Sequence, residues 1–221
     1  QHVPADQLGS RAISSARVDP AASGEGIKVS TRHITWVTPA MYEQALATAG
    51  VQDALVQVTA PFDVSGTAAL AGIYKAYEAS AGEALSAGRK ELGAEEIGVS
   101  LALARYLNDP DKASQFMTVL KQRLAEHPPE SREEIRQLIL DVADDMGIHL
   151  SDALVDELTT LLEKLRDAGI DWSLFEQQVQ AARDQVDRFL GDDVPMIRGI
   201  VDSVMDFFAR LVALFRSWFG A

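Results

Sequence analysis

The sequence predicts an α+β protein, in which a small mixed α/β unit is followed by an irregular antiparallel helical bundle. Strand-like and helix-like segments alternate in the order β-β-α-β-α over residues 1–82, and helical patterns alone fill residues 83–221. The composition is globular, since 47% of the 221 residues are hydrophobic and 24% are charged. A chain of this length buries a real core, and we expect two parts, residues 1–82 and residues 83–221.

Two strands open the first part. Residues 11–18 are rich in β-compatible side chains, and Asp19-Pro20 breaks the chain after them. Residues 27–37 have the pattern of a second strand, but the apolar side chains change parity between its start and Ile34. A β-bulge near residues 31–33, or a sheet covered on both faces, would reconcile the two parities.

A helix, a strand and a second helix complete this part. Thr38-Pro39 is a helix start, with threonine as N-cap and proline at the first helical position, and Gly50 ends that helix. Residues 54–60 have the pattern of a strand that Pro61 closes. The second helix is expected within residues 65–82, with its first three residues as the cap.

Several short runs between residues 8 and 80 follow one another in a recognisable order. They include LGSRAISS at 8–15, GIKV at 26–29, ITWVT at 34–38, ALATAGV at 45–51 and VSGTAAL at 64–70. On these runs the chain resembles the YpuA-like family of secreted bacterial proteins, catalogued as domain of unknown function 1002. The resemblance implies an exported protein with a signal peptide and a further folded stretch ahead of Leu8, and it implies no catalytic residues.

The second part reads as helices joined by short loops. Its helix starts are marked by a capping box at Ser131 to Glu134 and by caps at Ser151 and Asp171. Pro and Gly breaks separate helices whose apolar residues recur at helical spacing. The expected core stripes are Ile135, Leu138, Ile139, Val142; Leu154, Val155, Leu158, Leu161, Leu162, Leu165; and Leu174, Phe175, Val179, Ala182, Val186, Phe189. Such helices should fold back as antiparallel neighbours.

The charge is strongly acidic and unevenly distributed. The formal net charge is −13; residues 1–90 carry 7 Lys and Arg against 8 Asp and Glu, and residues 91–221 carry 13 against 25. A charge of this sign repels phosphate backbones, so no nucleic-acid partner is expected. The absence of cysteine excludes disulfides, zinc fingers and cysteine nucleophiles.

No constellation of residues indicates catalysis or a cofactor. The acidic run from Asp141 to Glu157 includes His149 but lacks metal-site spacing, so we interpret it as a solvated helical face. No Gly-x-Ser-x-Gly motif occurs, and His33 is interpreted as a packed or edge histidine. The turn at Gly66 to Ala68 resembles an anion-binding turn in outline, but close packing of a helix on a sheet explains its glycine.

The strongly apolar C-terminal helix, residues 193–220, is the exception. Arg198, Asp202, Asp206 and Arg210 form one polar stripe at four-residue steps, and the rest of its surface is apolar. Burying about ten such side chains would contribute on the order of 20 kcal/mol before ordering costs, so this surface should be covered. The predicted contact residues are Ile197, Ile200, Val204, Phe207, Phe208, Leu211, Leu214, Phe215, Trp218 and Phe219. Three partners fit: the chain's own bundle, a protein partner or second copy, and a membrane interface.

The leading hypothesis is a non-enzymatic exported protein of the bacterial envelope or extracellular space. It would bind a protein or membrane surface through the C-terminal helix. One alternative is a ligand-binding domain or enzyme with a site where the two parts meet, near Thr38, Asp63 and Ser65. Another is a stable fragment of a larger processed protein, because residues 1–10 lack the pattern of a signal peptide and residue 1 is not Met.

Overall fold

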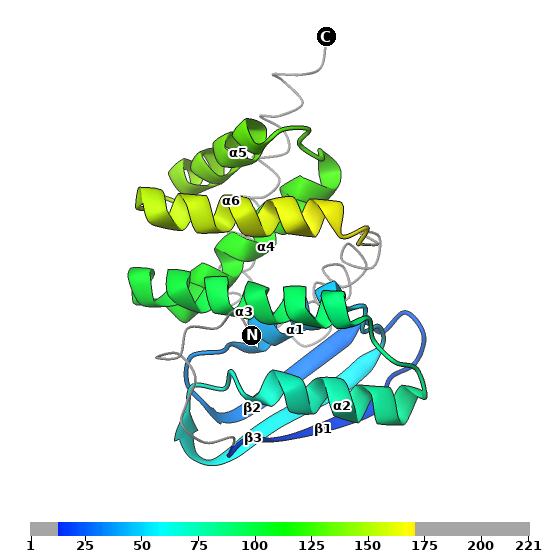
Figure 1. Cartoon of the computed structure of the whole chain (residues 1–221). Helices are drawn as coiled ribbons and strands as arrows, with labels where there is room; N and C mark the ends of the chain where they lie inside the picture. The colour runs from blue at the N-terminus through cyan, green and yellow to red at the C-terminus, as the bar shows by residue number, and fades with distance from the viewer. Residues whose placement is uncertain (1–12, 171–221) are drawn as a thin grey trace, which may run out of the picture. The chain divides into compact units, whose positions relative to one another are not determined.

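A computed structural model describes residues 13–170, which all belong to one compact unit, Gln1–Gln178 (Figure 1). The described residues form three strands and six helices, and the predicted α+β class and β-β-α-β-α order are confirmed. The elements are β1 (Ser15–Pro20), β2 (Ile27–Ile34), α1 (Pro39–Ala49), β3 (Ala54–Val64), α2 (Ala69–Ala81), α3 (Ala87–Leu107), α4 (Pro110–Glu126), α5 (Arg132–Asp145) and α6 (Asp152–Asp167).

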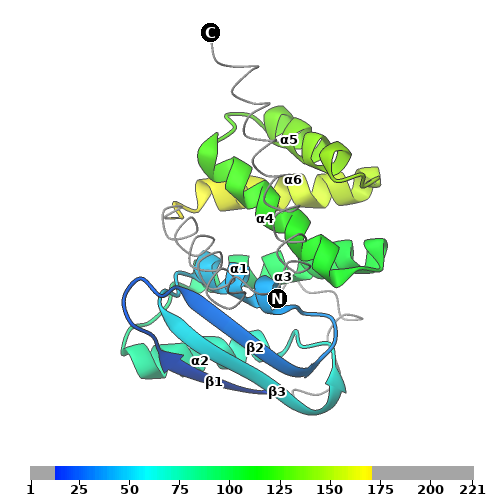
Figure 2. The ribbon, with the colours of Figure 1, turned by 180° about the vertical axis from the view of Figure 1, so that it is seen from behind.

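The sheet has the strand order β1-β3-β2 and carries helices on one face (Figure 2). β3 pairs antiparallel with β1 and parallel with β2, and α1 is the crossover between the two parallel strands. Alternation along β3 produces this asymmetry, because Ala54, Val56 and Val58 are buried under the helices while Gln57 and Thr59 are exposed. One face of the sheet is therefore polar and open to water.

The pairing of β2 is irregular at the predicted position, between Arg32 and Ile34, but the extra residues lie in β3 and not in β2. Arg32 pairs with Thr59 of β3, but the next pairing joins Ile34 to Val64, so β3 carries extra residues opposite His33. His33 has a positive φ of 60°, which accommodates the register shift. The parity change noted in the sequence is thus resolved by a bulge.

Several predicted strand limits are wrong, and proline explains two of them. The strand predicted over residues 11–18 begins at Ser15, and the one predicted over residues 27–37 ends at Ile34. The strand predicted over residues 54–60 continues through Pro61 to Val64, because Pro61 lies in the bulge where no ladder N–H is required. β1 contains Asp19 and Pro20, which were predicted to break it. The Ala21 N–H donates to the Asp53 carbonyl, so the neighbouring pair of Pro20 and Ala54 is a non-hydrogen-bonded pair of the ladder. Pro20 therefore needs no N–H toward β3.

The start of α2 also differs from the prediction. The residue at its N-cap is Ala68, whose side chain makes no capping hydrogen bond, and the Ala69 N–H bonds to the Gly66 carbonyl instead. Gly66 has a φ of +100°, and a Cβ there would lie 2.4 Å from Ile34 and 2.7 Å from the Tyr42 hydroxyl. The glycine is required for close packing, as the sequence indicated, and the Tyr42 hydroxyl donates to its carbonyl at 2.5 Å.

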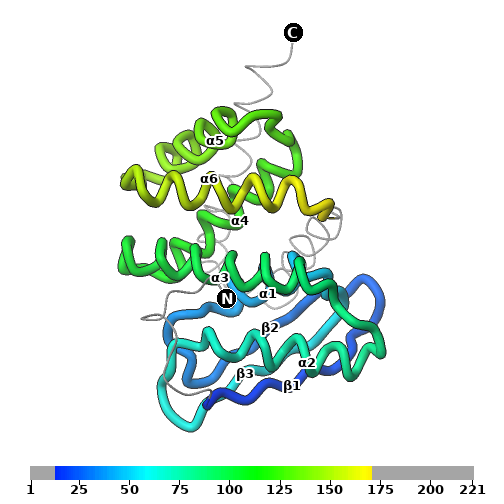
Figure 3. The backbone as a smooth tube through the Cα atoms, viewed as in Figure 1, coloured from blue at the N-terminus to red at the C-terminus, as the bar shows by residue number. Residues whose placement is uncertain are grey.

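Helices α3 to α6, which follow the sheet in the sequence, pack on one another (Figure 3). Three predicted caps are confirmed, since the side chains of Thr38, Ser131 and Ser151 accept from Met41, Glu134 and Leu154 N–H groups. The stripes predicted on α5 and α6 are buried, with Leu138 only partly so. The third predicted stripe and the cap at Asp171 lie outside the described residues.

Helix α1 joins the sheet layer to the later helices. It packs on β2 below and on α3 and α4 above, and Met41, Tyr42 and Leu46 are almost fully buried. This position places three helices from distant parts of the sequence around one polar cluster.

Candidate functional site

The ten predicted contact residues of the C-terminal helix, from Ile197 to Phe219, lie outside the described residues. Their assignment stays a prediction from sequence. Within residues 13–170, two groups of polar side chains are considered first: the junction predicted as an alternative site and a buried cluster that was not predicted.

At the alternative site, near Thr38, Asp63 and Ser65, polar groups are bonded to other groups of the same chain. Thr38 caps α1 and its hydroxyl lies 2.7 Å from that of Ser114 on α4. The Ser65 carbonyl accepts from the Val37 N–H at 3.0 Å. These bonds connect the carboxyl ends of the parallel strands to α1 and α4, so the side chain of Thr38 serves the fold.

His33 and Asp63 form an exposed pair at the same end of the sheet. The His33 Nδ1 lies 3.0 Å from the Asp63 Oδ1, and the side chains are 42% and 72% exposed. Asp63 orients the imidazole, and Phe62 beside it is 55% exposed. A histidine held by a carboxylate can act as a general base, but chemistry also needs a nucleophile or a bound substrate within its reach.

A buried cluster of Thr48, Glu96 and Lys121 joins α1, α3 and α4. The Lys121 ammonium donates to Glu96 Oε1 at 2.8 Å, to Thr48 Oγ1 at 2.9 Å and to the Gln44 carbonyl at 3.2 Å. Thr48 in turn donates to Glu96 Oε2 at 2.5 Å. Lys121 and Glu96 are each 1% exposed, and their charges are paired and hydrogen-bonded as burial requires.

The sequence does contain a signal for this buried cluster. Lys121 falls within the apolar stripe of α4 beside Met117, Leu120 and Leu124, and Glu96 falls within that of α3 beside Ile97. One acid and one base at core positions of different helices indicate a buried pair. Because no solvent reaches it, the cluster can position the three helices but cannot meet a substrate in this conformation.

Tyr74 of α2 lies at the border of this cluster. Its ring is buried, and its hydroxyl has no hydrogen-bond partner in the described part of the chain. Burial raises the pKa of Tyr74, and the negative charge of Glu96 raises it further. The hydroxyl faces Gly93 of α3, where a Cβ would lie 2.5 Å from it.

Glu43 is a second mostly buried acid, on the side of α1 that faces β2. Its Oε1 accepts the Val29 N–H at 2.9 Å, which is a backbone group at the free edge of β2. Burial raises the pKa of Glu43 from 4.5 to about 7, although the hydrogen bond from Val29 opposes this shift. The side chain therefore covers an otherwise unpaired edge N–H.

A pH dependence of stability follows from Glu43. Its pKa is higher in the folded chain than in the unfolded chain, so the folded state binds the extra proton between pH 4.5 and about 7. The free energy of unfolding should fall by about 3 kcal/mol as pH rises through this window, and Glu43→Gln should remove that loss. Urea unfolding of both proteins from pH 5 to pH 8 measures the difference. Parallel pH profiles of the two proteins would contradict the assignment.

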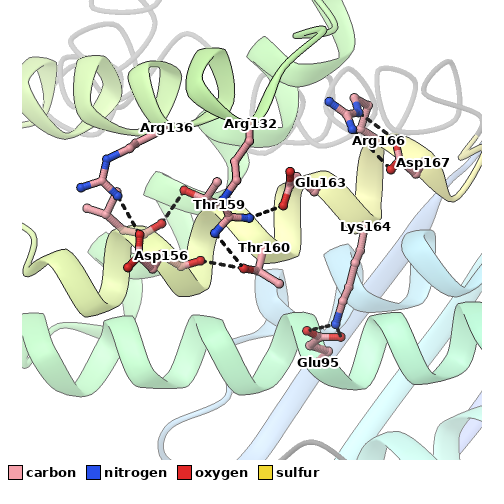
Figure 4. A network of polar contacts seen from close by, with 11 residues as sticks. Glu95, Arg132, Arg136, Asp156, Thr159, Thr160, Glu163, Lys164, Arg166 and Asp167 are labelled. Carbon is pink, nitrogen blue, oxygen red and sulfur yellow. Dashed lines mark hydrogen bonds and ion pairs between the residues drawn. The ribbon is translucent and has the colours of Figure 1, made fainter.

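The surface of the later helices carries many ion pairs (Figure 4). Arg132 pairs with Glu163, Arg136 with Asp156, and Lys164 with Glu95 at 2.6 Å. In the predicted acidic run, Asp141 accepts from Gln137 and Asp145 pairs with Arg123. No group of three metal-ligating side chains occurs among residues 13–170, and the run forms a solvated, charge-paired face.

None of the helices between residues 13 and 170 combines the length and the apolar character needed to cross a bilayer. The described chain is thus defined by a three-stranded sheet with one open face, a set of helices on the other, and a buried Lys–Glu pair that joins α3 to α4. This is a compact α+β unit in which the buried acid Glu96 is paired with a base and the mostly buried acid Glu43 is bonded to a backbone N–H.

The chain belongs to the family described as "Protein of unknown function (DUF1002)", whose model matches residues 1–182. The resemblance identified from the sequence is thereby confirmed. The chain is 36% identical over 205 residues to the uncharacterized protein YpuA of Bacillus subtilis (strain 168). The aligned region covers 93% of this chain and 70% of YpuA. No solved structure matches the chain significantly.

Proposed function

We propose that this protein is a non-enzymatic, exported bacterial protein that binds a protein or membrane surface through its apolar C-terminal helix, residues 193–220. The observation that carries the proposal is the sequence of that segment, where ten large apolar residues surround one narrow polar stripe. Export to the envelope or extracellular space is proposed from the YpuA-like resemblance.

The charges of the segment support binding through apolar contact. In a helix, Arg198 and Asp202 are neighbours, as are Asp206 and Arg210, so the polar stripe largely neutralises itself. The whole chain carries a net charge of −13, which repels anionic lipids at long range. We therefore expect binding that depends on apolar burial and only weakly on salt.

The described residues are consistent with a scaffold for such a segment. The buried charges at Glu96 and Lys121 satisfy one another and are closed to solvent, so they offer nothing to a dissolved substrate. The exposed His33–Asp63 pair is the remaining chemical group of interest at the strand ends. A ligand-binding site there is the second candidate function, and the observation that favours it is the exposed Phe62 next to this pair.

The test uses the full chain and a variant with Phe208→Asp and Phe215→Asp, two positions opposite the polar stripe of the predicted helix. We expect the variant to lose binding to zwitterionic vesicles, or its self-association, by roughly a thousandfold, because two buried aromatics contribute about 2 kcal/mol each. Arg210→Gln, on the polar stripe, is the matched control and should bind as the parent does. Vesicle flotation and light-scattering mass measure the two modes of binding.

Urea unfolding distinguishes contact surface from core. If the aspartate variant unfolds several kcal/mol more easily and the parent binds nothing, the helix closes its own bundle and the proposal fails. Export has a separate test, since fractionation of the native bacterium should place the protein outside the cytoplasm.

A further inference from the structure

The two edges of the sheet differ in how they are protected. At the β2 edge, the outward Val29 N–H is bonded to the Glu43 carboxyl, and α1 packs along the strand. At the opposite edge, β1 packs mainly on β3 and α2, and within residues 13–170 no side chain is bonded to its outward backbone groups. In the described part of the chain, β1 is therefore the edge that is open to pairing.

The register identifies which groups of β1 point outward. The Ala21 N–H donates to the Asp53 carbonyl, and this bond continues the register in which Asp19 pairs with Leu55 and Arg17 with Gln57. In an antiparallel ladder, hydrogen-bonded and non-bonded pairs alternate. The odd-numbered residues of β1 are thus bonded to β3, and the backbone groups of Ala16 and Val18 point to the free edge.

The side chains of β1 are complementary to a second copy of the same strand. Arg17 and Asp19 lie on the open face, with side chains 72% and 41% exposed, and they form an ion pair at 2.9 Å within the chain. If two β1 strands pair antiparallel about a two-fold axis through Val18, Arg17 of each copy lies directly opposite Asp19 of the other. Opposite charges at directly facing positions stabilise a sheet, and a two-fold interface repeats the contact.

The backbone fits the same register. Val18 would exchange both of its outward hydrogen bonds with Val18 of the second copy. On each side of the axis, the Ala16 N–H would donate to the Pro20 carbonyl of the other copy. Pro20 has no N–H to offer, so pairing cannot extend beyond it, and slipped registers lose the Arg17–Asp19 matches.

From these observations we propose that β1 is a self-association edge, through which two copies of this chain form one continuous six-stranded sheet in the order β2-β3-β1-β1-β3-β2. The inner face stays covered, because α2 packs over β1 with Gly72 close to the Ala16 methyl group. A six-residue strand buries less surface than a stable dimer requires, so association is expected at high micromolar to millimolar concentration.

Charge reversal tests the proposal in the full-length chain. Arg17→Asp places two acids opposite one another across the axis, and Asp19→Arg places two bases there. Each single variant should weaken dimerisation by roughly tenfold in sedimentation velocity. The double variant R17D/D19R should restore it, and an equimolar mixture of the two single variants should form a mixed dimer. Loss of the Arg17–Asp19 pair within one chain cannot account for rescue by mixing.

Amide exchange supplies a second measurement. Protection of the Ala16 and Val18 amides should rise with protein concentration, whereas that of the Val29 amide should not. Monomers at all concentrations, or amides at Ala16 and Val18 that are protected at high dilution, would overturn the proposal. Dimerisation that is equally strong in the parent and in both charge-reversal variants would also overturn the proposal. That result would not affect the proposed role of residues 193–220.

Discussion

Replacing Lys121 by methionine is expected to lower the free energy of unfolding by about 3 to 5 kcal/mol. Methionine matches the length of the lysine stem, so packing in α4 is nearly retained. The Glu96 carboxylate is only 1% exposed, and in this variant it loses its counter-charge. The Thr48 hydroxyl is then the hydrogen-bond donor that it keeps. An unpaired buried charge is among the most destabilising features that a single substitution can create.

The adjacent surface pair provides the matched control. Lys164 bonds to Glu95 at 2.6 Å, but the lysine side chain is 46% exposed. Lys164→Met should therefore change stability by less than about 1 kcal/mol. Urea unfolding of the two variants compares a buried and an exposed Lys–Glu pair that share neighbouring residues of α3.

The double variant Lys121→Met/Glu96→Leu separates charge from packing. It removes both charges and leaves the Thr48 hydroxyl free to bond the Gln44 carbonyl four residues earlier, as threonine does in helices. We expect it to recover most of the stability that Lys121→Met loses. Equal destabilisation of the single and double variants would mean that the cluster stabilises the fold through shape alone.

Local chemistry is the part of the fold that could be read from the sequence. A threonine or serine before a helical run caps it wherever the chain goes next, and Thr38, Ser131 and Ser151 do so. The irregularity at His33 was also indicated, because the parity of apolar residues changes within one strand and a bulge was one of the two arrangements that would reconcile it.

The sequence did not predict which backbone groups of neighbouring strands pair with one another. Whether Pro20 and Pro61 are tolerated depends on which backbone groups the neighbouring strand bonds, and both prolines fall where no N–H is needed. The cap of α2 was predicted wrongly for a related reason. Gly66 and the Tyr42 hydroxyl organise that turn, and Tyr42 comes from another element.

The same limit applies to the polar sites. Lys121 and Glu96 could be suspected as buried from their positions in apolar stripes, but only the packing of α3 on α4 brings them together. The predicted contact residues of the C-terminal helix rest on amphipathic pattern alone, which shows that the surface needs covering and leaves the covering partner open.

Substituting Gly93 by alanine is the second large expected effect, at about 2 to 3 kcal/mol of lost stability. Gly93 lies where α3 approaches α1, and a Cβ there would be 2.6 Å from the Ala45 carbonyl oxygen and 2.5 Å from the Tyr74 hydroxyl. The carbonyl belongs to the backbone of α1, so the two helices would have to separate. Alanine's better helix propensity, worth at most about 1 kcal/mol, cannot offset this displacement.

Gly88, in the first turn of the same helix, is the control for Gly93→Ala. A Cβ at Gly88 meets nothing within 4 Å, so Gly88→Ala should stabilise the protein by about 0.5 to 1 kcal/mol. Combining Gly93→Ala with Tyr74→Phe relieves the hydroxyl contact but keeps the backbone contact, and should recover only part of the loss. Thermal or urea unfolding measures all three, and a stabilising Gly93→Ala would show that α1 and α3 are not in close contact at this glycine.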